Sequence, residues 1–143
     1  MKATVLLADA ASDATGGKVS ALGLGWSQTG VPTSPMAVIV LVDVGWDETN
    51  RDLAIAVELL DADGHPVRHL GSGGGPAPVR IDAKAQVGRP PGLPPGTPIR
   101  VPITVSIGPG LPLQPGQTYQ WRVSIEGYDE ATASESFWVR RSA

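Results

Sequence analysis

The stretch QTYQWRVSIE, from Gln117 to Glu126, decides the fold class. Apolar side chains occupy every second position in it, at Tyr119, Trp121, Val123 and Ile125. Such period-2 alternation is typical of a β-strand with one face in a core and the other in solvent. The same pattern recurs at residues 79–87 and 99–107, where Pro102 indicates an edge strand or a bulge because proline cannot donate to the ladder.

The rest of the chain extends this β pattern. Further strands are expected at residues 2–9, 18–27, 36–44, 53–61, 66–70 and 131–140. Only WDETN, at residues 46–50, reads as a helical turn, with Asp47 as its expected cap. Eight or nine strands without an amphipathic helix between them predict an all-β chain, folded as one antiparallel β-sandwich domain over residues 1–143.

Composition narrows the class of protein. The 143 residues include no cysteine, which excludes disulfides and thiolate metal sites. Eleven Lys and Arg against fourteen Asp and Glu give a net charge of −3 without a basic cluster, so no nucleic-acid partner is expected. Asp9 interrupts the apolar start, and the apolar run at 36–44 is too short to span a bilayer. We therefore expect a cytoplasmic protein without a membrane partner.

Two loop segments punctuate the strands. HLGSGGGP, at residues 69–76, lacks the following helix and the Lys-Ser/Thr pair of a phosphate-binding loop. The Gly-rich loop at 71–78 is therefore expected to connect strands, and a lid over a binding surface is the alternative. The Pro-rich segment at 88–98 is expected to be a semi-rigid connection; its PxxP spacing, Pro91 to Pro94, leaves a groove-binding ligand as the alternative.

Three groups of polar residues are candidates for metal binding or catalysis. Asp61-x-Asp63-Gly64 begins like a calcium loop but lacks its later ligands, so a solvated turn is expected and an irregular calcium site is the alternative. His65 and His69 would lie about 13 Å apart along a strand, too far to chelate a metal. The acidic residues Asp43, Asp47, Glu48 and Asp52 fit a capped turn better than an acid–base pair. We expect no catalytic residue, no cofactor and no metal.

The segment LPLQPGQTY, ending at Tyr119, fits the pattern L-x-P-G-x-x-Y. It resembles the tyrosine corner of fibronectin type III and other immunoglobulin-like sandwiches. The resemblance implies a Greek-key sandwich in which the tyrosine hydroxyl bonds back to the backbone and residues 117–140 form the last hairpin. It implies nothing about function.

Several longer segments carry a second resemblance: MKATVLLADAA, GWS, VDVGWDETN, ELLDADGHPV and SFWV. With them, most of the chain is similar to a family of short actinobacterial proteins that has only a domain-of-unknown-function label. This resemblance implies a stand-alone bacterial protein and no particular activity.

Two features are candidate functional surfaces. Alternation places Trp138 on the solvent face if Phe137 and Val139 face the core, and a bulge that turns it inward is the alternative. An exposed Trp near Arg is typical of binding hot spots, so the predicted partner-binding residues are Trp138, Arg122 and Gln120.

The second feature is MAVIVLVDV, residues 36–44, which is apolar on both faces. Either other parts of the chain cover it, or Val38, Val40 and Val42 form a subunit interface. The predicted function is a non-enzymatic interaction or structural module with a protein partner or a second copy. A small-molecule or carbohydrate-binding domain that uses Trp138, Trp26 or Trp46 is the alternative, and a hydrolase is a third reading.

Overall fold

The computed structural model describes residues 1–14, 17–70 and 73–141. These ranges contain twelve strands and two single-turn 3₁₀ helices. In chain order they are β1 (Lys2–Ala8), β2 (Ala10–Ala14), β3 (Lys18–Leu22), β4 (Gln28–Thr29), β5 (Met36–Val44), η1 (Trp46–Glu48), β6 (Asp52–Asp61), β7 (Arg68–Leu70), β8 (Pro76–Pro78), β9 (Arg80–Gln86), β10 (Ile99–Ile107), β11 (Thr118–Ile125), η2 (Asp129–Ala131) and β12 (Ala133–Val139). The prediction of an all-β chain is therefore confirmed.

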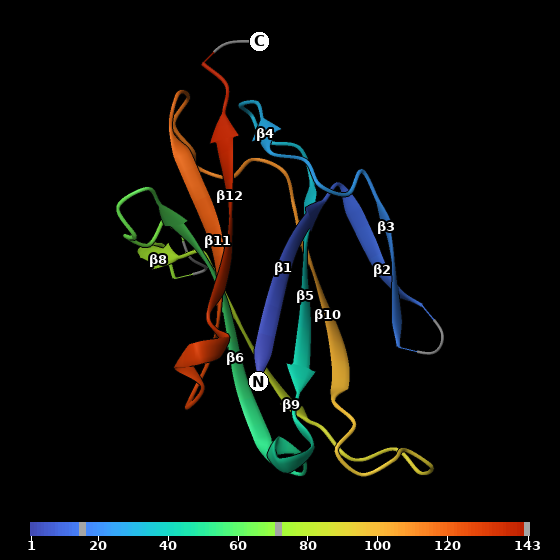
Figure 1. Ribbon diagram of the computed structural model, residues 1–143. Coiled ribbons are helices and arrows are strands. Elements are labelled where there is room, and N and C mark those ends of the chain that lie inside the picture. The colour runs from blue at the N-terminus through green and yellow to red at the C-terminus, as the bar shows by residue number, and fades with distance from the viewer. Residues whose placement is uncertain (15–16, 71–72, 142–143) are drawn as a thin grey trace.

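Two sheets form the body of the molecule (Figure 1). One has three strands in the order β1-β5-β10, and the other has five in the order β4-β12-β11-β6-β9. All neighbouring strands in them are antiparallel except β4 and β12, which run parallel. We call the sides that face each other the inner faces and the opposite sides the outer faces.

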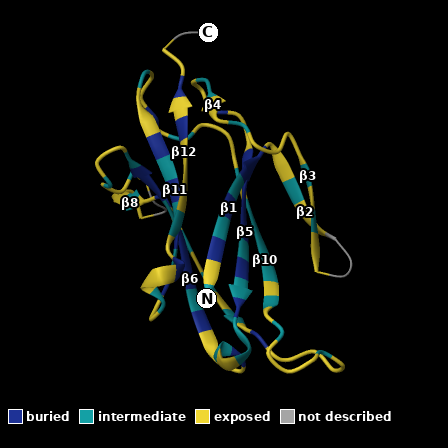
Figure 2. Ribbon diagram, in the orientation of Figure 1, coloured by how far each residue is buried: buried dark blue, intermediate teal, exposed yellow. Residues whose placement is uncertain are grey.

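The core lies between the inner faces, where alternate residues of both sheets meet. Trp121, Phe137, Leu59 and Val40 are among its fully buried side chains. Figure 2 shows the central strand β5 in the colours of buried and half-buried residues. The predicted alternation at residues 117–126 is thus confirmed, because Tyr119, Trp121, Val123 and Ile125 are all buried.

The β2–β3 hairpin adds a third layer against the outer face of the three-stranded sheet. Beneath it lies a second apolar cluster of buried Ala8, Ala37 and Ile39, packed against half-buried residues that include Val19 and Ala21 of β3. The first of the two readings of residues 36–44 is therefore confirmed, because the chain covers both faces of β5 itself.

The β7–β8 hairpin projects from the other sheet, and its β8 strand is formed by Pro76–Pro78. The predicted loop at 71–78 is thus too long at its C-terminal end, because the backbone of these residues pairs with Arg68–Leu70. Gly71 and Ser72 of that prediction lie outside the described residues. Residues 88–98 connect β9 to β10, as expected.

The predicted helical turn exists as η1, but its cap differs from the expectation. The N-cap is Gly45, whose N–H donates to Glu48 Oε1 at 2.9 Å, so Asp47 lies in the first turn and does not cap it. Both helices of the described ranges are single turns, and none is long and apolar enough to cross a membrane.

Candidate functional site

Trp138 lies on the outer face of the five-stranded sheet with 36% of its surface exposed. Its chain neighbours Phe137 and Val139 are buried in the core, so strand alternation turns the indole outward. The outward orientation of Trp138 is confirmed, and no bulge reverses it.

Short or uncharged polar residues surround Trp138. Thr118 on β11 and Gln28 on β4 are its direct cross-strand partners, Ser136 lies two residues away on β12, and Gln120 is the diagonal neighbour on β11. Of these four residues, Gln120 is half-buried and the other three are exposed. We call Trp138 with these four residues the Trp138 face; none of the five is charged, and the exposed Arg140 lies two residues beyond Trp138 in the chain.

The predicted proximity of Arg122 to Trp138 is wrong. Arg122 pairs with Ser134, whereas Trp138 pairs with Thr118. Thr118 and Arg122 are four residues apart on β11, which separates their Cα atoms by about 13 Å. Alternation placed both residues on the correct face, but only the register of the β11–β12 hairpin fixes which pairs meet.

Arg122 belongs instead to a row of charges across the sheet. It lies opposite Glu58 on β6, and Glu58 lies opposite Arg80 on β9. Arg80 reaches Glu58 Oε2 at 3.8 Å. Arg122 also extends toward the turn after β6, where Gly64 adopts a left-handed φ of +82° and a Cβ there would lie 4.0 Å from Arg122 Nη2. The Arg122 guanidinium therefore belongs to the charged row with Glu58 and Arg80 and not to the surroundings of Trp138.

The predicted interface residues Val38, Val40 and Val42 are not at a surface. Each is 0% exposed, because each points inward between the two sheets. A second subunit cannot reach them in this fold, so the prediction of a subunit contact through these side chains is wrong.

The other candidate tryptophans have structural contacts. Trp26 packs edge-to-face on Phe137 with ring centroids 5.2 Å apart. Trp46 holds the Pro-rich connection, because the Arg89 guanidinium lies 4.3 Å from its ring centroid and donates to its carbonyl at 2.7 Å. Trp26 and Trp46 are both half-buried, whereas Trp138 is exposed.

The acidic residues near η1 are held separately. Asp43 accepts from Arg100 Nε at 2.7 Å, and this hydrogen bond lowers the pKa of the Asp43 carboxyl against the opposing effect of desolvation. Glu48 Oε1 lies 2.9 Å from the Met1 ammonium, whose hydrogen bond is the main cause of the lowered pKa of Glu48. Both carboxyls are thus stabilised as anions, which suits ion pairing and not general-acid chemistry.

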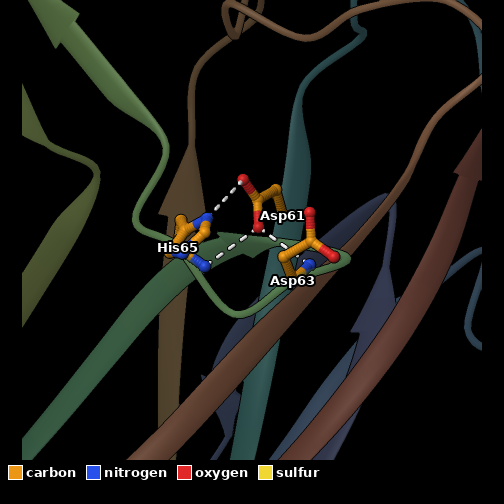
Figure 3. Close-up of side chains that lie close together, drawn as sticks. All are labelled: Asp61, Asp63 and His65. Atoms are coloured by element: carbon orange, nitrogen blue, oxygen red, sulfur yellow. Dashed lines mark hydrogen bonds and ion pairs between the residues drawn. The ribbon is translucent and has the colours of Figure 1, made fainter.

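Asp61, Asp63 and His65 meet in the turn after β6 (Figure 3). Their potential ligand atoms lie within 4.8 Å of one another, a grouping that the separate inspection of Asp61-x-Asp63 and of the two histidines missed. Asp61 Oδ1 accepts the backbone N–H groups of Asp63 and His65, each at 2.9 Å. Through these two hydrogen bonds the Asp61 carboxylate stabilises a solvated turn, as the sequence predicted.

A hollow of about 360 Å³ lies on the outer face of the five-stranded sheet, over the small residues Ala54 and Ala56. Arg80, Asp82 and Glu126 also line it. Its single hydroxyl, on Ser124, has neither histidine nor lysine beside it in the lining.

A family model described as "Family of unknown function (DUF6941)" matches residues 3–137. The chain therefore belongs to this family, which agrees with the resemblance to a domain of unknown function. Searches of curated proteins and of solved structures found no significant match. The matched range ends one residue before Trp138, so membership itself does not bear on that side chain.

Proposed function

We propose that this member of the DUF6941 family is a non-enzymatic interaction module that binds a protein partner through the Trp138 face. The observation that carries the proposal is the 36% exposure of Trp138 in an uncharged polar setting. Tryptophan is enriched among residues that dominate binding energy, because one rigid side chain buries a large apolar area.

The contacts of the other aromatic residues support this role. Among the described residues, the aromatic and cation–π pairs involve Trp26, Phe137, Tyr119 and Trp46, and none involves Trp138. Its indole thus has no stacking partner in the part of the chain that the structure describes. Binding would add contacts without breaking existing ones.

The neighbours of Trp138 suit a protein surface. Thr118, Ser136, Gln120 and Gln28 offer hydroxyl and amide groups that both donate and accept. An aromatic anchor ringed by adaptable, uncharged polar groups is typical of interfaces with little electrostatic steering. We therefore expect a partner with an apolar pocket and a polar rim.

The test is quantitative affinity capture from a lysate of the source organism with wild-type protein, Trp138→Ala and Leu70→Ala. Leu70 is the matched control because it is 78% exposed on the β7–β8 hairpin, away from the Trp138 face. A specific partner should bind wild type and Leu70→Ala equally and lose at least about thirtyfold in affinity for Trp138→Ala, as hot-spot truncation does. Capture of the same proteins by all three would contradict the proposal.

A small-molecule or carbohydrate ligand is the second candidate for the same face. The observation that favours it is the pairing of the indole with the amides of Gln28 and Gln120, because an apolar ring beside amide groups suits a ligand with both apolar faces and hydroxyls. A saccharide panel followed by tryptophan fluorescence tests it. A shift that Trp138→Ala abolishes would favour this candidate over the protein partner.

We also propose that the sandwich is immunoglobulin-like, of the fibronectin III type. If β1, β5, β6, β9, β10, β11 and β12 are strands A, B, C, C′, E, F and G, the two sheets read A-B-E and C′-C-F-G. The Tyr119 hydroxyl accepts the Gln114 N–H at 2.9 Å, which is a bond back to the backbone of the kind that the corner motif implies. An actinobacterial source and a cytoplasmic location stay predictions of the sequence.

A further inference from the structure

Strand β9 ends the five-stranded sheet, with β6 on one side and no further strand of the described residues on the other. None of its seven residues is buried. Exposed edges are templates for pairing, and proteins blunt them with proline, bulges or charged side chains, lysine above all. The other edge strands of the two sheets are β1, β4 and β10, and of these β10 has Pro102. Strand β9 has no proline between Arg80 and Gln86.

The backbone groups that face the open side can be assigned. The Val79 carbonyl accepts from Leu59 N at 3.0 Å, so residue 79 points toward β6. Because N–H and C=O directions alternate along a strand, residues 81, 83 and 85 also point toward β6. The N–H and C=O groups of Arg80, Asp82, Lys84 and Gln86 therefore point away from the sheet, toward any strand that pairs there.

The side chains of these four residues make the edge complementary to itself. When two copies of β9 pair antiparallel, the inner faces of both sheets must lie on the same side of the joined sheet. This holds only in registers in which one residue of β9 lies opposite the same residue of the other copy. A register centred on Asp82 opposes Asp82 to itself and Arg80 to Lys84, and one centred on Lys84 opposes two lysines. A register centred on Ala83 opposes Asp82 to Lys84 twice and Arg80 to Gln86 twice.

A register centred on Ile81 would also oppose unlike charges, Arg80 to Asp82. It would pair only the start of β9, because beyond Arg80 the next residue on the open side is Pro78, which has no N–H to donate. The register centred on Ala83 uses the whole strand, Arg80 to Gln86, and sets Ile81 against Ala85 on the inner face.

We propose that the protein forms a two-fold symmetric dimer through antiparallel pairing of β9 with β9 of a second copy, with Ala83 facing Ala83. In this register Asp82 and Lys84 form a hydrogen-bonded backbone pair as well as an ion pair. Within one chain the Asp82 carboxylate already accepts from Arg80 Nε at 3.1 Å, so Lys84 of the second copy would be its second cationic partner. The contact is isologous and closed, so it ends at two copies and does not propagate into a fibre.

The dimer joins two five-stranded sheets into one continuous sheet. Because the symmetry axis is perpendicular to that sheet, both outer faces lie on the same side. This places two Trp138 faces together and makes the dimer bivalent, a consequence that rests on the proposed function, whereas the dimer itself does not. Bivalence raises avidity for a partner that presents two sites.

Single cysteines test the register directly, because the chain contains none. Residues in a non-hydrogen-bonded antiparallel pair have Cα atoms about 4.5 Å apart, within reach of a disulfide. Ala83→Cys should therefore cross-link under mild oxidation. The matched control Ala85→Cys, on the same strand and face, should not, because residue 85 faces Ile81 of the other copy. Equal cross-linking of both, or of neither, overturns the proposal.

Light scattering across a concentration series tests the charges. Wild type should be a dimer; Asp82→Lys and Lys84→Glu should each weaken it at least about tenfold, and the double exchange should restore it. A wild-type monomer at every concentration, or a double variant no better than the single ones, overturns the proposal. Trp138→Ala should keep the dimer mass, so failure of the proposed function and failure of the dimer give different results.

Discussion

The two outer faces of the sandwich differ in what covers them. On the three-stranded sheet, Ala37 and Ile39 are 1% and 3% exposed because the β2–β3 hairpin lies over them. On the five-stranded sheet, Trp138 is 36% exposed and its neighbours are short or polar. A strand that is apolar on both faces requires a third layer, whereas an alternating strand does not. The large side chain left uncovered on an alternating strand is thus open to binding, and the covered ones stabilise the fold.

The largest expected effect contrasts Phe137 with Trp138, adjacent residues on opposite faces. Phe137 is buried against Trp26 and Tyr119, with ring centroids 5.2 and 6.1 Å away. Phe137→Ala should lower the free energy of unfolding by about 3–5 kcal/mol, because it leaves a cavity in the core. Urea unfolding followed by circular dichroism measures this; a loss below about 1 kcal/mol would show that β12 is not anchored here.

The covered face should respond nearly as strongly. Ile39 lies under the hairpin, so Ile39→Ala should cost about 2–4 kcal/mol. A matched control is Ser136→Ala on the open face, for which a change within about 0.5 kcal/mol is expected. If both substitutions are neutral by thermal denaturation, the hairpin does not protect the sheet as described.

Tyr119→Phe should have an intermediate effect. It removes the hydroxyl that accepts the Gln114 N–H and leaves that donor part-buried, so a loss of roughly 1 kcal/mol is expected. The inner-face packing of the ring against Phe137 should persist. An unchanged melting curve would remove the support that this bond gives to the immunoglobulin-like assignment.

A smaller, pH-dependent effect is expected at the edge of the covered face, where Asp43 pairs with Arg100. The folded pKa of Asp43 is lowered, so its contribution to stability is present above the ordinary pKa and is lost as the pH falls through the folded value. Asp43→Asn should flatten the fall in stability below about pH 4. Unfolding measured between pH 2 and 6 checks this; an identical slope in the variant would contradict the assignment.

Period-2 alternation predicted the long strands because their β-branched and aromatic residues mark one face. It missed β2, β4 and β8 for different physical reasons. Residues 10–14 are mostly Ala, Ser and Asp, which have low strand propensity, and β4 has only two residues. Pro76–Pro78 pairs despite its prolines because it lies in an isolated two-stranded hairpin.

The candidate site was predictable only in part. Alternation alone placed Trp138 outward once Phe137 and Val139 were taken as core. It could not place Arg122, because the pairing of β11 with β12 depends on the geometry of the connection through η2. Nor could it show whether a hairpin or a second copy covers residues 36–44, since both bury the same apolar pattern. The self-complementary charges of β9 are visible in the sequence, but only the sheet order shows that β9 is an edge.

The unfolding free energy of Trp138→Ala against wild type tests the central claim most directly, because it separates a binding side chain from a core one. The account predicts a loss of about 1 kcal/mol, since the indole is partly exposed and has short neighbours. A loss of about 3–5 kcal/mol, as for a core tryptophan, would mean that Trp138 is packed in the fold and that the Trp138 face is not a binding surface.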